Sequence, residues 1–320
     1  FKLLGRCVGT SAAAEVCAAC DLELIGRKDT EVALISRYDG RHACGHCFKR
    51  AARHGDKDIR HRGKAVDIRA PAREHNGASA CELIRLYGGI GQALAKRFAS
   101  GGYRLFLQGY KQMDRLQSLA RELQEQYHTS VHTFSCDISD YSSVRAMFHE
   151  ILQSDSYPEV LVNNAGIAHF ALLQDMEEAD WDRVMNTNAK SVFSCCKNIL
   201  PAMLHQHRGS IINISSMWGC TGSSMEAAYS ASKGAVNALT RALGKELAPS
   251  GIRVNAIACG VIDTPMNDCL APEDRQALAE EIPMQRFGRP EEVADLAWYL
   301  AGPDSSYLTA QVLPLDGAYM

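Results

Sequence analysis

The sequence predicts an α/β fold in which helices cover both faces of a doubly wound parallel sheet. Two observations predict it. From Gly88 onward, short apolar runs alternate with longer segments of helical periodicity, which is typical of a parallel sheet with helical crossovers. This part of the chain is also long enough to bury a sizeable core, because single domains commonly reach about 250 residues.

The expected elements alternate regularly along the chain. We expect strands near residues 103–108, 130–136, 159–163, 210–215, 252–258 and 310–315. We expect helices near residues 90–100, 113–127, 140–153, 177–206, 227–248 and 290–301. Apolar spacing supports the second and third helices, whose inward faces are marked by Leu116, Leu119 and Leu123 and by Val144, Met147, Phe148 and Ile151.

The composition argues against several kinds of partner. The chain has 320 residues and a formal net charge of -3, so its overall charge attracts neither nucleic acid nor a membrane surface. No run approaches the roughly 18 apolar residues of a membrane span, and Arg6 interrupts the apolar opening too early for a secretory segment. The cysteines after Cys81 are scattered through apolar segments, as reduced buried thiols are. We expect a cytoplasmic protein with no metal site in this part of the chain.

Residues 1–80 read as an atypical extension to a domain that we expect at 81–320. Between Arg37 and His75 there are eleven Lys or Arg, five Asp or Glu and five His, with almost no apolar periodicity. Three interpretations remain open for this segment. It is a disordered tail, a stretch of out-of-frame or mis-joined translation, or a pair of zinc knuckles with the ligands Cys17, Cys20, Cys44 and Cys47.

Ser216, Tyr229 and Lys233 form a candidate catalytic set. Tyr229 and Lys233 are four residues apart and share one face of a helix, where the ammonium would favour the ionised phenol and lower its pKa. Ser216 ends the preceding strand and would hold a carbonyl oxygen against that phenol. The arrangement suits the reduction of a ketone or the oxidation of an alcohol. A solvated helical pair is the alternative for Tyr229 and Lys233 taken alone.

A glycine-rich turn opens the first expected helix. Gly88, Gly89, Ile90 and Gly91 would let a pyrophosphate approach the backbone at the helix N-terminus. The preceding sequence, CELIRLY at 81–87, fits less well. It has a glutamate where a buried strand is expected and an arginine where a turn glycine is expected. We therefore do not expect a regular apolar strand there.

Polar residues also follow other expected strands. Asp137 would accept a hydrogen bond from an adenine amino group or cap the helix at 140–153. The run NNAG at 163–166 lies where such sheets bind ligands, with a simple turn as the alternative. Asn188 falls in the middle of a helix although asparagine is a poor helix former, so either a functional role or solvent exposure would explain it.

Together these residues resemble a short-chain dehydrogenase/reductase with a Rossmann-type sheet, and within that family the beta-ketoacyl-(acyl-carrier-protein) reductases. The resemblance covers the chain from about Gly88 to Met320. The matching segments are NNAG at 163–166, Ser216, Tyr229-x-x-x-Lys233, VNAIA at 254–258, RPEEVA at 289–294 and Asp316-Gly317.

The resemblance implies a role for each matching residue. Tyr229 would protonate the carbonyl oxygen, Lys233 would lower the pKa of Tyr229 and hold the ribose, and Ser216 would orient the carbonyl. Asn188 would anchor a water relay to Lys233. The family further implies a homotetramer, built in part on the helices that follow residues 177 and 227. The remaining cofactor contacts would come from Asp137, Ile138, Asn164, Ile262 and Thr264.

The glycine turn departs from the family pattern. The family's Thr-Gly-x-x-x-Gly-x-Gly would fall on residues 84–91, so its front half is replaced by Ile84, Arg85, Leu86 and Tyr87. Weak cofactor binding would follow from this departure. A non-enzymatic alternative is therefore a scaffold protein that kept the fold and lost its cofactor.

The residues after the strand at 103–108 favour NADP(H) over NAD(H). Gly109 occupies the position where an NAD-selective enzyme places a ribose-binding aspartate, and Lys111 lies close enough to attract a 2′-phosphate. NADP(H) is the expected cofactor and NAD(H) the alternative.

The expected carrier of the substrate is acyl carrier protein, as in fatty acid biosynthesis. Its acidic surface would need basic groups on the reductase. The two usual positions fall on His207 and Ser250 in this sequence, and Arg208 and Arg253 lie nearby as substitutes.

Glu226 and Trp218 are expected beside the substrate, together with Ser216. A carboxylate there would attract an amine and disfavour an anionic thioester carrier, unless it is only a solvent-facing charge at the helix start. The pattern S-x-W-G-x-x-G-x-S-x-E at 216–226 also resembles the subgroup that reduces the aminopentanone side chain of elongation factor P. Two substrate classes remain open: ketoacyl thioesters, and an amine-bearing or protein-bound ketone.

Overall fold

The computed structural model describes residues 22–25, 33–36, 82–85, 88–153, 157–267 and 270–320. The chain divides into two compact units, Phe1–Pro71 and Ala72–Met320. In the first unit, β1 (Leu22–Ile25) pairs antiparallel with β2 (Ala33–Ser36). The cysteines considered as zinc ligands, Cys17, Cys20, Cys44 and Cys47, lie outside the described residues.

The described residues of the second unit build a seven-stranded sheet in the order β5-β4-β3-β6-β7-β8-β9, with every neighbouring pair parallel. The strand order reverses between β3 and β6, as a doubly wound fold requires. The predicted fold class is confirmed. The strands are β3 (Glu82–Arg85), β4 (Leu105–Gly109), β5 (Val131–Ser135), β6 (Val160–Asn163), β7 (Gly209–Ser216), β8 (Ile252–Cys259) and β9 (Val312–Leu315).

The central strand β3 corrects one expectation, because the sequence at 81–87 did not indicate a strand. Glu82–Arg85 pairs with β4 along its whole length, but with β6 only at Glu82 and Leu83. Backbone hydrogen bonds to two flanking strands define a strand independently of side-chain polarity. The position in the sheet therefore prevails over an unfavourable local composition.

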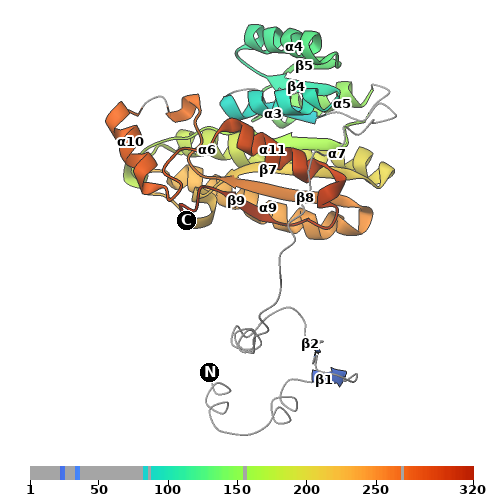
Figure 1. Cartoon of the computed structure of the whole chain (residues 1–320). Coiled ribbons are helices and arrows are strands. Elements are labelled where there is room, and N and C mark those ends of the chain that lie inside the picture. Colours follow the sequence, from blue (N-terminus) through green and yellow to red (C-terminus); the bar gives the residue numbers. More distant parts are fainter. Residues whose placement is uncertain (1–21, 26–32, 37–81, 86–87, 154–156, 268–269) are drawn as a thin grey trace. The chain divides into compact units, whose positions relative to one another are not determined.

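Helices cover both faces of the sheet (Figure 1). On one face Phe98 of α3 (Gly89–Ser100), Leu116 of α4 (Met113–Tyr127) and Val293 of α11 (Pro290–Ala301) belong to one buried cluster. The opposite cluster contains residues of α5 (Tyr141–Leu152), α7 (Ser191–Gln206) and α9 (Ala227–Leu247). Successive strand residues point to opposite clusters, as in Leu105 and Phe106, because side chains alternate along a strand.

The helix expected at 177–206 is divided in two. α6 (Glu178–Met185) and α7 are separated by a π-helical turn, η2 (Asn186–Lys190), which contains Asn188. Two further helices, α8 (Trp218–Thr221) and α10 (Pro272–Glu281), were not predicted. Short 3-10 turns lie at Leu173–Asp175, Ala248–Ser250, Pro265–Asn267 and Pro303–Ser305. Within the described residues, none of the helices has the length and apolar character needed to cross a bilayer.

The start of α11 shows how local sequence fixes a helix boundary. Pro290 occupies the first turn, where a missing N–H costs nothing. Glu292 accepts a hydrogen bond from the Arg289 backbone N at 2.7 Å and pairs with Arg286 at 2.7 Å. These contacts lower the pKa of Glu292 to about 2, with the Arg286 hydrogen bond as the largest cause. The expected and observed bounds of this helix coincide.

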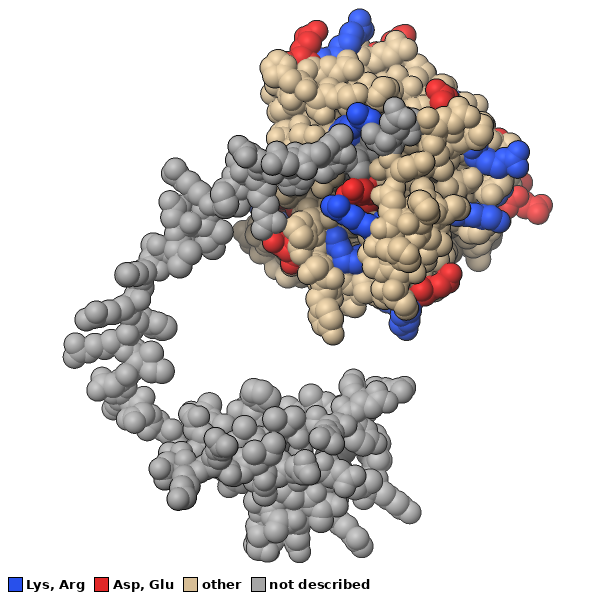
Figure 2. Space-filling view, turned by 90° about the vertical axis from the view of Figure 1, so that its right-hand side faces the viewer, with Lys and Arg blue, Asp and Glu red and all other residues tan. Residues whose placement is uncertain are grey.

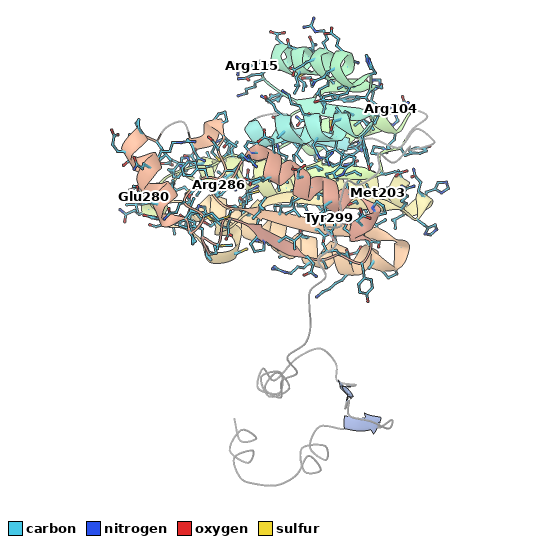
Figure 3. The ribbon with its side chains drawn as sticks, in the orientation of Figure 1. Arg104, Arg115, Met203, Glu280, Arg286 and Tyr299 are labelled. Atoms are coloured by element: carbon cyan, nitrogen blue, oxygen red, sulfur yellow. The ribbon has the colours of Figure 1, made fainter. Side chains whose placement is uncertain are left out.

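The carboxyl ends of the strands form one edge of the unit, away from the side chains of Met203 and Tyr299. Within the second unit, Figure 3 shows Glu280 of α10 and Arg286 towards one side and Met203 and Tyr299 towards the other. Since ligands of open α/β sheets bind outside the carboxyl ends of the strands, the edge near Arg286 is where a site is expected.

α8 packs on α9 so closely that a side chain at Gly219 has no room. A Cβ at this position would lie 2.6 Å from the carbonyl carbon of Lys233. Gly234 is different, because a Cβ there would meet only the Gly219 carbonyl oxygen, at 3.6 Å. The two glycines, one on each helix, therefore differ in how well they would tolerate a methyl group.

We predict that Gly219→Ala lowers the free energy of unfolding by about 1–3 kcal/mol, the usual cost of overpacking. Gly234→Ala, in the interior of α9, should leave stability unchanged or raise it by up to about 1 kcal/mol, because alanine is the better helix former. Urea unfolding of the whole chain measures both. Equal effects of the two substitutions would contradict the close α8–α9 contact.

Candidate active site

The candidate catalytic residues meet where β7 ends. Ser216 is the last residue of β7, and its Oγ accepts a hydrogen bond from the Trp218 backbone N at 3.2 Å. Tyr229 lies on α9, and its phenol forms a side-chain hydrogen bond with Ser216. The structure therefore brings together Ser216 and Tyr229, as the sequence predicts.

Lys233 lies one helical turn beyond Tyr229 and is 4% exposed. Its Nζ donates to the Ile214 carbonyl oxygen at 2.8 Å and lies 5.8 Å from the centroid of the Tyr229 ring. This bond joins α9 to β7 just before Ser216. The ammonium is held in the interior beside the phenol, so the pair is not a solvated helical pair.

The net pKa shift of Tyr229 in this structure is upward, and the lowering expected from Lys233 stays a prediction. Burial of the phenol raises the pKa of Tyr229, and the hydrogen bond from Ser216 only partly offsets that rise. Desolvation dominates because the charged phenolate loses its water, while the ammonium is directed at the Ile214 carbonyl. Tyr229 is therefore a neutral proton donor at neutral pH.

Asn188 is completely buried, which removes the solvent-exposed alternative. Its Oδ1 accepts from the Ile167 N at 2.8 Å, and its Nδ2 donates to the Ile167 O at 2.9 Å. The same Nδ2 donates to Ser232 Oγ at 2.9 Å, and Ser232 donates to the Tyr229 carbonyl at 2.7 Å. From the π-helical turn, the Asn188 side chain thus binds both the loop after β6 and helix α9. Such turns are frequent at functional sites.

Ser232, which sequence reasoning missed, and Gly166, from the predicted run at 163–166, complete this arrangement. Ser232 links Asn188 to the backbone of Tyr229, and its signal was its place directly before Lys233. A Cβ on Gly166 would lie 3.2 Å from Lys233 Nζ and 3.8 Å from Asn188 Oδ1. The bare glycine backbone therefore leaves space that borders both polar groups.

Glu226 lies at the N-cap of α9, where its side chain makes no capping hydrogen bond. It is 7% exposed, so it is not a solvent-facing charge. Burial raises the pKa of Glu226, and a hydrogen bond with the Ser223 side chain partly offsets the rise. None of the ion pairs found among the described residues includes this carboxylate. A buried carboxylate without a cation is costly, and a bound cation would reduce that cost.

On the cofactor side, the glycine turn meets the loop that follows β8. Gly88 has φ +104, a conformation that favours glycine, and open space lies where its Cβ would be. A Cβ on Gly89 would lie 3.3 Å from Thr264 Cγ2 and 3.2 Å from Pro290 Cγ. Ile90 and Gly91 continue into α3, while Ile262 is buried beside Thr264. The structure thus places Gly89 next to Thr264, two residues predicted to bind the cofactor.

The residues predicted to hold adenine, Asp137 and Ile138, lie just after β5. Asp137 Oδ1 accepts from the Ser139 backbone N at 3.0 Å and from the Ser139 hydroxyl at 2.6 Å. The cap of α5 is Asp140 rather than Asp137, because Asp140 accepts from the Ser143 backbone N at 2.8 Å. Ile138 is 7% exposed and packs into the core.

Gln108 has an acceptor that the described part of the chain leaves unsatisfied. It is 1% exposed, and its Nε2 donates to the Cys136 carbonyl at 2.5 Å, next to Asp137. Among the residues that the structure describes, none donates a hydrogen bond to its Oε1. An unsatisfied buried acceptor costs about 1–3 kcal/mol, so a ligand donor such as an amino or hydroxyl group would be favourable here.

Gly109 is the last residue of β4, and Lys111 follows it two residues later. Lys111 is exposed, and its Nζ lies 5.9 Å from the centroid of the Tyr110 ring. A Cβ on Gly109 would lie 2.9 Å from Leu116 Cδ2 of α4, so a carboxylate side chain there would have to displace Leu116. The residues present fit a nicotinamide dinucleotide, with Asn164 following β6 as the remaining predicted contact. Leu86 and Tyr87, in the altered half of the turn, lie outside the described residues.

The two arginines considered for an acidic carrier both have partners within the chain. Arg253 donates to the Leu300, Ala301 and Gly302 carbonyls at 2.6, 3.2 and 3.1 Å and so satisfies the end of α11. Arg208 pairs with Glu159 at 2.9 Å. On the face shown in Figure 2, basic and acidic side chains are interspersed rather than gathered by sign.

Comparison with known proteins agrees with this geometry. Residues 87–320 match the family described as enoyl-(acyl carrier protein) reductase. The 3-oxoacyl-[acyl-carrier-protein] reductase FabG of Thermotoga maritima is 39% identical over 237 residues, covering 74% of this chain and 96% of that protein.

Two solved structures share the fold. The 3-oxoacyl-[acyl-carrier protein] reductase of Brucella melitensis matches with a TM-score of 0.71 at 32% identity, covering 76% of this chain and 92% of its own. A variant of actinorhodin polyketide ketoreductase, solved with NADPH, matches with a TM-score of 0.71 at 32% identity. The match covers 75% of this chain and 97% of the ketoreductase chain. The chain belongs to the short-chain dehydrogenase/reductase family, and it is an oxidoreductase that interconverts a carbonyl and an alcohol with a nicotinamide cofactor.

Proposed function

We propose that this chain is an NADP(H)-dependent reductase of 3-oxoacyl thioesters, which acyl carrier protein would present as in fatty acid biosynthesis. The observation that carries the proposal is the meeting of a half-buried phenol, a serine hydroxyl and a buried ammonium at the end of β7. The substrate class is supported by the names of its relatives, which act on 3-oxoacyl groups held by acyl carrier protein.

Each residue has a distinct part in the proposed reduction. Ser216 donates a hydrogen bond that orients the carbonyl oxygen, and neutral Tyr229 gives that oxygen its proton. Lys233 holds the cofactor ribose. Its positive charge also stabilises Tyr229 while the phenol loses its proton. Asn188 holds a water that returns a proton towards Lys233, across the space beside Gly166. When bound, the cofactor supplies the hydride.

The preference for NADP(H) over NAD(H) is also a proposal. Gly109 carries no carboxylate to repel a 2′-phosphate, and Lys111 offers a positive charge two residues later. Gln108 Oε1 would accept a hydrogen bond from the adenosine half. A cofactor-deficient scaffold is the opposing interpretation, and micromolar binding of NADPH in an equilibrium titration would exclude it.

We also propose that the reductase domain occupies residues 81–320 and that the protein forms a homotetramer. The family match begins at residue 87 and the second compact unit at Ala72, which supports the domain bounds. Phe193 of α7 is 47% exposed, and its ring stacks on that of Tyr141 with the ring centroids 6.4 Å apart. Lys197 Nζ lies 5.5 Å from the centroid of the Phe193 ring. An exposed aromatic surface on this helix suits a subunit interface.

A ketone that carries an amine is the second candidate substrate, including the aminopentanone side chain of elongation factor P. The buried, uncompensated carboxylate of Glu226 favours it, because a substrate ammonium would supply the missing positive charge. Arg253 and Arg208 are both occupied, which weakens the case for an acidic carrier at those positions.

Tyr229→Phe tests the proposed chemistry. We expect kcat for acetoacetyl-thioester reduction to fall by about 10²–10⁴-fold, because general acid catalysis contributes this much. The assay follows NADPH oxidation, and NADH should support a lower kcat/KM in the wild-type enzyme. Tyr307→Phe, at a fully exposed ring, is the matched control and should be unaffected. Tyr229→Phe with wild-type activity would refute the proposed acid.

Glu226→Gln should shift the pH profile of alcohol oxidation to lower pH. The negative charge of Glu226 disfavours the phenolate and so raises the pKa of Tyr229. Removing that charge lowers this pKa, and oxidation, which needs the phenolate as a base, begins at lower pH. The pH dependence of kcat/KM with a 3-hydroxyacyl thioester measures the shift. A profile that stays in place would show that Glu226 does not act on Tyr229.

The two substrate classes predict opposite responses to the same substitution. If an amine binds at Glu226, Glu226→Gln should lower kcat/KM for aminopentanone-modified elongation factor P by at least about tenfold, equivalent to about 1.4 kcal/mol. The acetoacetyl thioester should be reduced as well as before or better. Absence of turnover of the modified protein by the wild-type enzyme would eliminate the second candidate.

A further inference from the structure

Tyr319, in the segment that follows β9, contacts two elements on the substrate side of the site. Its ring meets the Trp218 ring edge-on, with centroids 6.4 Å apart and planes at 61°. Its hydroxyl donates to Glu281 Oε2 at 2.8 Å, and Glu281 is the last residue of α10. One side chain therefore links α8 to α10.

Trp218 is fixed close to the reacting centre. Its backbone N donates to Ser216 Oγ, and the next residue, Gly219, packs directly against the backbone of Lys233. The backbone of α8 is thus anchored to both Ser216 and α9. The indole of Trp218 projects from this anchored backbone, and Tyr319 supplies an aromatic contact for it.

α10 depends on a few contacts, because none of its residues is buried. Arg275 pairs with Asp263 at 2.6 Å, and Asp263 lies between Ile262 and Thr264 on the cofactor side. At the other end, Ile282 follows the helix and is 2% exposed. The Tyr319 hydroxyl adds the contact that ties α10 to the Trp218 side.

Tyr319 is itself held in place by its neighbours. Asp316 Oδ1 accepts from the Ala318 N at 3.0 Å, and Oδ2 accepts from the Met320 N at 3.2 Å. Burial and the nearby Glu281 carboxylate raise the pKa of Tyr319. The hydroxyl therefore stays protonated and remains a hydrogen-bond donor to Glu281.

We propose that Tyr319 is a positioning residue for the substrate: its ring fixes Trp218 beside Ser216, and its hydroxyl holds α10 on the same side of the site. This inference rests on the proposed carbonyl reduction and adds a determinant of which carbonyl compounds fit. Tyr319 does not touch the reacting groups, so its loss acts on KM and not on the chemical step.

The test compares Tyr319→Phe, Glu281→Leu, which has no acceptor for the Tyr319 hydroxyl, and the double variant with acetoacetyl-coenzyme A and the longer 3-oxooctanoyl-coenzyme A. We expect each single variant to raise KM for the longer substrate by about threefold to tenfold, the size of one hydrogen bond, with kcat unchanged. The double variant should raise KM for the longer substrate no more than either single variant does, because both substitutions remove the same hydrogen bond. Tyr319→Leu should raise KM further, because the ring contact with Trp218 is also lost.

Hydrogen exchange of the α10 amides gives a readout that does not depend on turnover. Tyr319→Phe and Glu281→Leu should each speed exchange in residues 272–281. The matched control is Tyr299→Phe, which removes a hydroxyl that donates to the Asp304 carbonyl at 3.4 Å, towards the other side of the second unit (Figure 3). It should change neither KM nor exchange in α10.

The outcomes separate this inference from the proposed function. Unchanged KM and unchanged exchange in Tyr319→Phe would overturn the positioning role, as would a loss in kcat alone. If the wild-type enzyme reduces neither thioester, the proposed function fails. Hydrogen exchange of the α10 amides then tests by itself whether Tyr319 holds α10. Faster exchange in α10 would still support the contact between Tyr319 and α10, and unchanged exchange would overturn it.

Discussion

The buried ammonium of Lys233 is the constraint on which the candidate site depends. A buried charge costs several kcal/mol unless polar partners surround it. The Ile214 carbonyl meets that need at 2.8 Å, which requires α9 to lie against the end of β7. Two glycines permit the approach: Gly166, whose missing side chain leaves space beside Nζ, and Gly219, which lets α8 close over the Lys233 backbone. The contacts that pack α8 and α9 against the end of β7 therefore also set the geometry of the candidate site.

Much of the fold could be predicted because its signals are local. The bounds of α4 and α11 coincide with those expected, since apolar periodicity and Pro290 are read directly from the sequence. The strand β3 and the helix α10 could not be predicted in the same way. β3 depends on two neighbouring strands, and α10 has almost no hydrophobic periodicity because it buries no residue.

The site was predictable in its membership but not in its electrostatics. Strand order alone places Ser216 and the loop after β6 at one edge, and helical spacing aligns Tyr229 with Lys233. The direction of the Tyr229 pKa shift required the burial of its ring, which only the packed structure defines. Arg253 gave no sign of its role either, because the carbonyls that it binds lie 47 to 49 residues away in sequence.

Arg253 also gives α11 a mechanical role. The helix has 12 residues and spans about 18 Å. At one end Arg253 of β8 binds its carbonyls, and at the other Pro290 lies where a Cβ on Gly89 would be 3.2 Å away. α11 therefore spans the distance from the amino edge of the sheet, where Arg253 lies, to the glycine turn. Arg253, on the amino half of β8, and the glycine turn therefore contact opposite ends of the same helix.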